Sequence, residues 1–184
     1  FNSQPTLLYI NQKSGQLKMA TYTGTKWVKK SIDGRTVGNK TGAIKGALSA
    51  CVSGTSPKQT LNIFYSDISY SDLHFAQYDG KKFKYETVDG DAPIENKYED
   101  PIRVRTSSDV SVTSACVATT DNVQVFYRDE SQGIVLGAVK KAKSSEWVYE
   151  LLDGDRKTDG RTTGDVAFHL SALQDGKTTY VLYD

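Results

Sequence analysis

The sequence has 184 residues, of which 38% are hydrophobic and 24% are charged, so it can form one globular domain with its own core. Lysine and arginine number 23 against 22 aspartate and glutamate residues, which leaves a formal net charge of +1. A chain this close to neutral has no bulk field that attracts nucleic acid or an acidic membrane. Its apolar runs fall short of the ~20 residues of a membrane helix. We therefore expect neither nucleic acid nor a membrane as a partner.

Short segments of period-two alternation follow one another along the chain, separated by clusters of Gly, Asp, Asn and Ser. This pattern is typical of strands and turns, and no segment predicts a helix. Strand b is expected at 6–10, 61–65, 123–127 and 179–183, and strand c at 17–20, 73–76 and 134–137. Strand d opens on an aromatic residue (Trp27, Phe83 or Trp147) and ends in Asp-Gly, while strand a is expected at 48–51, 113–116 and 170–173.

These strands form an internal repeat with a period near 60 residues, since 56 residues separate Asp33 from Asp89 and 64 separate Asp89 from Asp153. Four antiparallel strands per repeat predict the blade of a β-propeller. We expect an all-β fold with about three four-stranded blades in a single segment, 1–184, with repeats at about 5–60, 61–122 and 123–184.

Three blades cannot close a ring, because propellers contain about four to eight and an open sheet edge is left at each end. Two arrangements stay open. Either a second copy of the chain completes a six-bladed ring, or the chain is a piece of a longer propeller that supplies the remaining half.

The order of these motifs resembles a known family. Strands of the form I-x-V-Y-Y, then L/I-x-x-A, then Tyr/Trp-Asp-Gly-x-x-Trp resemble the fungal and bacterial fucose-specific lectins of the Aleuria type. The resemblance covers about 6–183 and implies a six-bladed propeller that binds sugar between adjacent blades. It also implies a site with an Arg on strand b, a Glu on strand c, and aromatic residues around the turn between strands c and d.

Only the aromatic half of that site is present in this sequence. The aromatic positions correspond to Tyr22, Trp27, Tyr78, Phe83 and Trp147, the Arg position to Leu7, Asn62, Gln124 and Tyr180, and the Glu position to Met19, Phe75 and Leu136. The candidate ligand-binding residues are therefore Tyr22, Trp27, Asn62, Tyr78, Phe83, Gln124 and Trp147. Each also has a structural interpretation, because aromatic residues fill the space between sheets and polar residues line solvated strand faces.

Two functions follow from the resemblance. The first is a secreted or extracellular carbohydrate-binding propeller with aromatic clefts between blades, whose partner is a glycan or another small-molecule ligand. The alternative is a lectin-like enzyme with an apolar pocket, such as a fungal pericyclase of the Diels-Alderase kind. No catalytic residue is assigned, and no motif indicates a cofactor or a metal site.

The cysteines and histidines carry no recognisable catalytic spacing. Cys51 and Cys116 take the same position in the repeat, where the third copy has Leu173, so we expect small buried sites with free thiols rather than a disulfide. His74 and His169 are expected to be hydrogen-bonded structural residues rather than general bases.

Overall fold

The structure is a computed structural model that describes residues 1–91, 109–110, 112–155 and 160–184. In this part of the chain it contains thirteen β-strands and no helix. Sheet I holds β1 (Thr6–Asn11), β2 (Gln16–Tyr22) and β3 (Trp27–Gly34), and sheet II holds β4 (Ile44–Ser53), β5 (Thr60–Asp67), β6 (Leu73–Tyr78) and β7 (Phe83–Asp89). Sheet III holds β8 (Ser114–Ala118), β9 (Asn122–Asp129), β10 (Ile134–Lys141) and β11 (Val148–Asp153), and sheet IV holds β12 (Leu170–Asp175) and β13 (Thr178–Tyr183).

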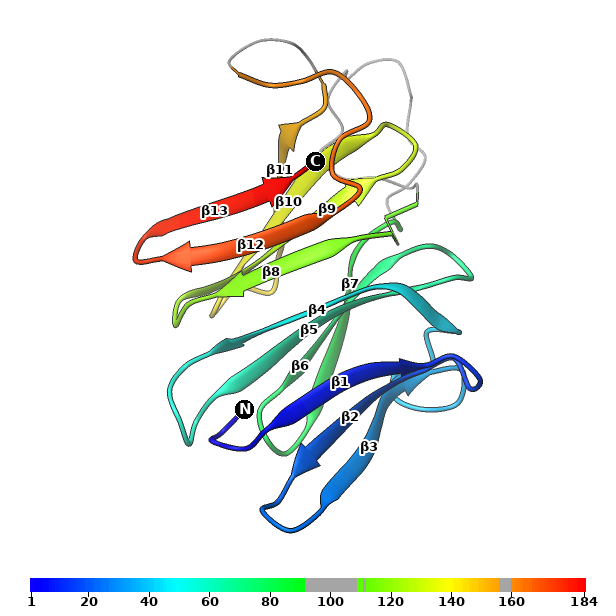
Figure 1. Cartoon of the computed structure of the whole chain (residues 1–184), viewed down its shortest axis with the longest axis vertical. Coiled ribbons are helices and arrows are strands. Elements are labelled where there is room, and N and C mark those ends of the chain that lie inside the picture. The colour runs from blue at the N-terminus through cyan, green and yellow to red at the C-terminus, as the bar shows by residue number, and fades with distance from the viewer. Residues whose placement is uncertain (92–108, 111, 156–159) are drawn as a thin grey trace.

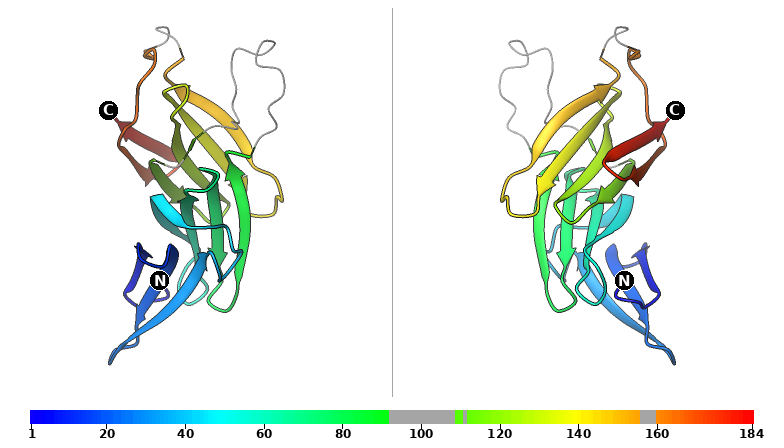
Figure 2. Two further views of the ribbon diagram at one scale, coloured as in Figure 1. Left: turned by 90° about the vertical axis from the view of Figure 1, so that its right-hand side faces the viewer. Right: turned by 90° about the vertical axis from the view of Figure 1, so that its left-hand side faces the viewer.

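Within each sheet, consecutive strands pair antiparallel, so the expected four-stranded blades are confirmed in sheets II and III (Figure 1). Sheet I holds strands b, c and d, and sheet IV holds strands a and b. The strands β8, β12 and β13 lie on one side of the molecule and β7 and β11 on the other (Figure 2). None of the described residues forms a helix that is long and apolar enough to cross a membrane.

The core lies between successive sheets and follows from the two-residue alternation of each strand. In β5, Ile63 packs toward sheet I and its neighbour Phe64 packs toward sheet III, and both are 0% exposed. The seam between sheets I and II includes Leu17, Met19, Ile32, Leu61 and Tyr65, and the seam between sheets II and III includes Leu73, Val88, Val125, Tyr127 and Leu136.

A Tyr–Asp hydrogen bond crosses each of the three seams between sheets; it is buried in the first two seams and partly buried in the third. The hydroxyl of Tyr65 donates to Asp33 (2.6 Å), that of Tyr127 to Asp89 (2.7 Å) and that of Tyr183 to Asp153 (2.7 Å). Each Asp also accepts the N–H of the glycine that follows it. The Asp-Gly ends of strand d therefore tie each sheet to the next, a role that sequence reasoning missed because it read them only as strand ends.

Strand pairing corrects the sequence alignment of the repeats at two positions. In the middle of the sheet, Asn62 pairs with Gln77 and Gln124 pairs with Val139, and the equivalent pair in sheet I is Thr6 with Thr21. Thr6, not Leu7, therefore takes the position of Asn62. The same comparison places Gly137, not Leu136, at the position of Phe75, since β10 is one residue out of the expected register.

The same register explains the position of the two cysteines. Cys51 lies opposite Asn62 and Cys116 lies opposite Val125, so they are not at equivalent positions. Because alternate side chains point to opposite faces, Cys51 faces sheet III and Cys116 faces sheet II. Both thiols are free, as expected, and they are half-buried where small buried sites were expected. Burial and the contact with Cys51 raise the pKa of Cys116.

Candidate functional site

A cleft of about 570 Å³ opens between sheets II and III, at the end where the β4–β5, β8–β9 and β10–β11 turns lie. Its floor is formed by the seam that contains Phe75 and Val123. Toward the turns the apolar residues give way to polar ones, because the forward faces of β5, β6 and β7 carry Asn62, Gln77, Lys84 and Glu86 there. The alternation of side chains along three adjacent strands thus places these polar residues on the face that lines the cleft.

The amides of Asn62 and Gln77 are fixed by hydrogen bonds in the wall of the cleft. Gln77 Nε2 donates to Asn62 Oδ1 at 3.2 Å, and Asn62 Nδ2 donates to Ser53 Oγ at 3.1 Å. Asn62 is 0% exposed, so the amide of Gln77 is the more accessible of the two. Fixed amides of this kind offer donors and acceptors at set positions.

Glu86 joins the two walls of the cleft. Its Oε2 accepts from Nζ of Lys140, with which it forms an ion pair, and from Nε1 of Trp147 at 3.0 Å. The Trp147 ring packs edge-on against Phe64 and Phe75, with centroids 5.9 and 5.3 Å away. Trp147 therefore packs in the seam, in agreement with its structural interpretation. It also donates a hydrogen bond to the Glu86 carboxylate in the cleft.

The seam between sheets I and II uses the same positions with different chemistry. Lys30 takes the position of Glu86, and its Nζ lies 4.9 Å from the ring centre of Tyr78 and 4.8 Å from that of Phe83. Tyr78 and Phe83 stack at 4.4 Å. These two candidate residues therefore come together, but as the partners of a lysine in the seam between sheets I and II, not in the cleft that contains Asn62.

The remaining candidates lie apart from both groups. Tyr22 and Trp27 form a tilted pair at 5.4 Å at the end of sheet I, where Trp27 is 44% exposed. Gln124 faces sheet IV, where its Oε1 accepts from Thr179 Oγ1 at 3.4 Å. The structure thus places five of the seven candidates at three interfaces between sheets and the other two, Tyr22 and Trp27, at the end of sheet I, instead of gathering them in one site. Sequence reasoning missed Lys84, Glu86 and Lys140, which line the cleft beside Asn62.

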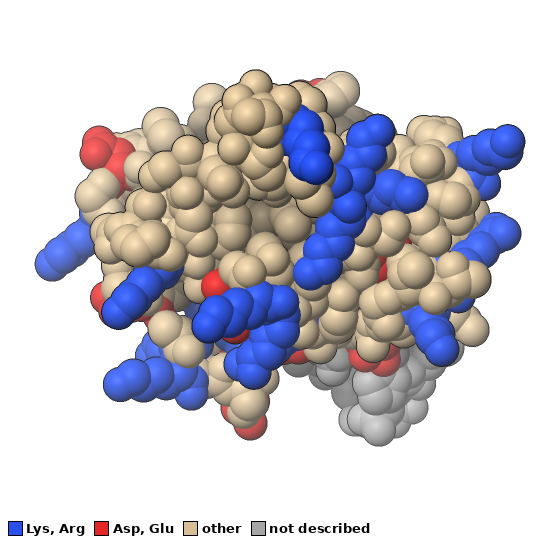
Figure 3. Space-filling model, turned by 90° about the horizontal axis from the view of Figure 1, so that it is seen from below, with Lys and Arg blue, Asp and Glu red and all other residues tan. Residues whose placement is uncertain are grey.

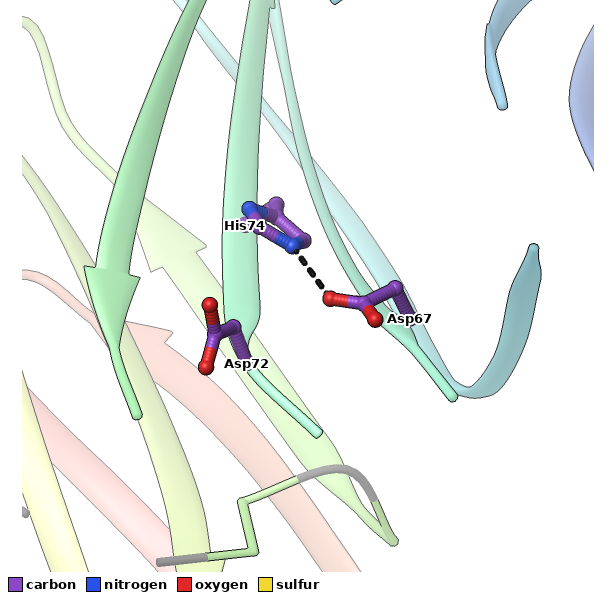
Figure 4. A group of neighbouring side chains, drawn as sticks. All are labelled: Asp67, Asp72 and His74. Carbon is purple, nitrogen blue, oxygen red and sulfur yellow. Dashed lines mark hydrogen bonds and ion pairs between the residues drawn. The ribbon is translucent and has the colours of Figure 1, made fainter. Parts of the chain in front are cut away.

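A second polar cluster, Asp67, Asp72 and His74, lies at the other end of β5 and β6, and these residues could offer one metal ligand each within 4.8 Å of one another (Figure 4). His74 Nε2 and Asp67 Oδ2 are 2.8 Å apart, and Asp67 Oδ1 accepts the N–H groups of Ser69 and Tyr70. Burial opposes ionisation of Asp67, but these hydrogen bonds lower its pKa below the ordinary value. Burial raises the pKa of Asp72.

Sheet III shows why this cluster is structural. Asp129, which takes the position of Asp67, accepts from the N–H of Ser131 and from the side-chain amide of Gln132. His74 thus satisfies a buried turn carboxylate that a glutamine satisfies in the next sheet, and this supports the structural role expected for it. His169 likewise bonds a carboxylate, that of Asp184, at 2.8 Å, although it is exposed.

Comparisons with known proteins bear on the fold. No protein-family model and no curated protein sequence matches the chain. Three solved structures of the lectin from Aleuria aurantia are similar over 98% of this chain at 14–16% identity. A mutant in complex with α-methyl-L-fucoside aligns with a TM-score of 0.62, a six-bladed β-propeller with fucose recognition with 0.60, and a mercury derivative with 0.54.

The chain spans about half the length of each of these lectin chains, from 49% to 52%. The all-β fold and the resemblance to this propeller are thereby confirmed. Because the identity is low, the similarity concerns the fold, and the site must be judged from its own residues. The chain has the fold of half of a six-bladed, lectin-like β-propeller.

Proposed function

We propose that this chain is a lectin-like carbohydrate-binding half-propeller, and that its binding site is the cleft between sheets II and III. The observation that carries the proposal is the side-chain set of this cleft, in which the Glu86 carboxylate, the Lys140 ammonium group and the Gln77 amide surround one concave space. The Aleuria aurantia lectins to which the fold is similar recognise fucose. The enzyme alternative, which expected a mostly apolar pocket, stays a prediction.

Sugar binding needs both polar groups and an apolar wall. Carboxylates and amides bond hydroxyl groups, while an aromatic face covers the C–H patch of a sugar ring. Glu86 and Gln77 supply the polar groups, and Phe75 with Val123 supplies the apolar floor beside them. The volume of the cleft falls within the range of about 300–1,000 Å³ that is usual for small-molecule sites.

A glycan array followed by calorimetry on the strongest binder tests this proposal. Gln77→Val places in the cleft the residue that sheet III carries at the equivalent position, Val139, so the strand should tolerate it. We expect affinity to fall about ten-fold, the effect of removing one buried hydrogen-bonding group. Gln124→Val is the matched control, because Gln124 faces sheet IV. Absence of binding to every glycan would refute the proposal.

We also propose that the other half of the ring covers the two open ends of the chain. On sheet IV the apolar side chains Leu173, Tyr180 and Leu182 are 60%, 51% and 59% exposed. The edge of β13 that faces away from β12 has no paired strand among the described residues, and neither has the edge of β1 that faces away from β2. Exposed edges and apolar patches mark surfaces that normally pair.

Solution mass tests how the ring is completed. A mass of twice that of the chain supports a second copy, and heavier species that contain another polypeptide support a separate half. A stable, non-associating monomer would contradict this proposal without bearing on sugar binding. A secreted or extracellular location belongs to the same lectin proposal, and detection of the protein in culture medium would test it.

A further inference from the structure

The mouth of the cleft between sheets II and III is strongly basic. Its lining contains the four lysines Lys84, Lys140, Lys141 and Lys143 against one carboxylate, that of Glu86. We infer that the ligand of this cleft is an anionic saccharide, a sugar that carries a carboxylate or a sulfate group. The inference rests on the proposed function and names the class of its ligand.

The positive charge is not neutralised within the site. Lys140 and Glu86 form an ion pair and offset each other. Lys84, Lys141 and Lys143 are exposed, and none of them forms an ion pair within the described part of the chain. Several like charges around one concave surface raise its potential and attract an ion of opposite sign. The three ammonium groups are therefore available to an anion at the mouth, above the polar wall.

The net charge of the whole chain conceals this arrangement. With +1 overall, a basic cleft requires that acidic residues lie elsewhere. Figure 3 shows Lys and Arg side chains gathered on the end of the molecule that is seen from below, with few acidic side chains among them. The uneven distribution of charge, rather than its sum, indicates the ligand class.

Lys84 is particular to this cleft and not a feature of the repeat. It lies opposite Gln77 in sheet II, whereas the equivalent residues are Val28, opposite Thr21 in sheet I, and Val148, opposite Val139 in sheet III. A valine fits this strand position twice in the same chain, so strand packing does not require a lysine. Packing therefore leaves this position free to carry a cation that binds a ligand.

The floor of the cleft favours a sugar over a nucleic acid. Proteins that bind single strands stack bases on exposed aromatic faces along a continuous basic groove. Here Phe75 is 2% exposed, and Trp147 is half-buried with its ring against Phe64 and Phe75. The cleft thus offers hydrogen-bonding groups and a confined volume but no open stacking platform.

The test applies the full chain to an array of neutral, carboxylated and sulfated glycans at low and high salt. We expect acidic glycans to bind and their binding to weaken at high salt, because salt screens exposed charges. The carboxylated and sulfated arms identify which anion is preferred. Lys84→Val and Lys143→Gln should each lower the affinity for the strongest-binding acidic glycan about two- to five-fold, the effect of losing one exposed charge pair.

Lys13→Gln is the matched control, because Lys13 is exposed in the β1–β2 turn and does not line the cleft. An equal loss in this variant would show that total charge, not the site, attracts the glycan, and would overturn the inference. Binding of neutral glycans alone, without salt dependence, would overturn it while the proposed function stands. Binding of a single-stranded oligonucleotide that depends on Lys84, in place of acidic glycans, would also overturn it, and no glycan binding at all would refute both.

Discussion

Replacing Tyr65 by phenylalanine measures how strongly the Tyr–Asp bond holds neighbouring sheets together. The substitution removes one hydroxyl and leaves the ring, so the packing of the seam is retained. The deleted hydroxyl donates to Asp33 Oδ2 at 2.6 Å, and both residues are 0% exposed. Asp33 keeps the N–H of Gly34 at 2.8 Å and the hydroxyl of Thr41 at 2.7 Å.

The expected loss follows from the charge of the acceptor. Burial and the neighbouring Asp33 raise the pKa of Tyr65, so its hydroxyl stays protonated and donates throughout the neutral range. A hydrogen bond to a buried charged group contributes about 1.5–3 kcal/mol, and two partners of Asp33 remain. We therefore expect Tyr65→Phe to lower the free energy of unfolding by about 2 kcal/mol.

Urea unfolding followed by tryptophan fluorescence measures the change, provided that the slope m is unaltered. Tyr183→Phe is the graded comparison, since Tyr183 is 41% exposed and its bond to Asp153 competes with water. We expect it to cost less than about 1 kcal/mol. Equal losses at Tyr65 and Tyr183, or a loss at Tyr65 below about 0.5 kcal/mol, would refute the reasoning.

Three further changes test other parts of the structure. Gly90→Ala should cost about 2 kcal/mol in thermal unfolding, more than Gly80→Ala, because Gly90 has φ +102° and a Cβ there would lie 2.8 Å from Asp72 Cα. The lowered pKa of Asp67 stabilises the fold above its unfolded pKa near ~4, and this stability is lost as the pH falls through the folded pKa, so Asp67→Asn should reduce the acid dependence of the urea midpoint. Trp147→Ala should cost about 3 kcal/mol and abolish glycan binding, while Trp147→Phe should retain most of the stability in the same assays.

The strands were predictable because each carries its own evidence in the chain. Alternation of period two marks a strand without reference to its neighbours, and four copies of strand b confirm one another. The register between strands was harder to predict from the sequence. Aligning the two copies of strand b by their letters put Leu7 at the position of Asn62. The pairing of Thr6 with Thr21, and of Asn62 with Gln77, makes Thr6 the equivalent residue, and this pairing depends on the neighbouring strand.

The residues that line the candidate cleft could be predicted only in part from the sequence, for a physical reason. Asn62 stands out in the sequence because it interrupts an apolar strand, whereas Lys84 and Glu86 lie on a strand where charged residues on an exposed face would be ordinary. Their importance depends on sheet III, which supplies Lys140 and Trp147 from the other side of the seam. The available signal was the exchange of Lys30 for Glu86 at one repeat position, which marks the seams as chemically different.

Tyr9 connects the Tyr–Asp bonds to the completion of the ring. It takes the position of Tyr65 in sheet I, because Tyr9 pairs with Lys18 as Tyr65 pairs with His74. No residue in the described part of the chain accepts its hydroxyl. In a complete ring the preceding sheet would lie beside β1, and an Asp at the end of its strand d would meet Tyr9.

Tyr9→Phe therefore reports on assembly. In the monomeric chain we expect a change below about 0.5 kcal/mol, since the hydroxyl is hydrated in both folded and unfolded states. In an assembled ring whose preceding sheet ends in Asp-Gly, the same change should cost about 2 kcal/mol, as at Tyr65. A second copy that completed sheet IV with its own β2 and β3 would displace β1 and leave Tyr9 without this partner. The loss at Tyr9, measured beside the solution mass, thus separates a ring built from intact neighbouring sheets from one built by strand exchange.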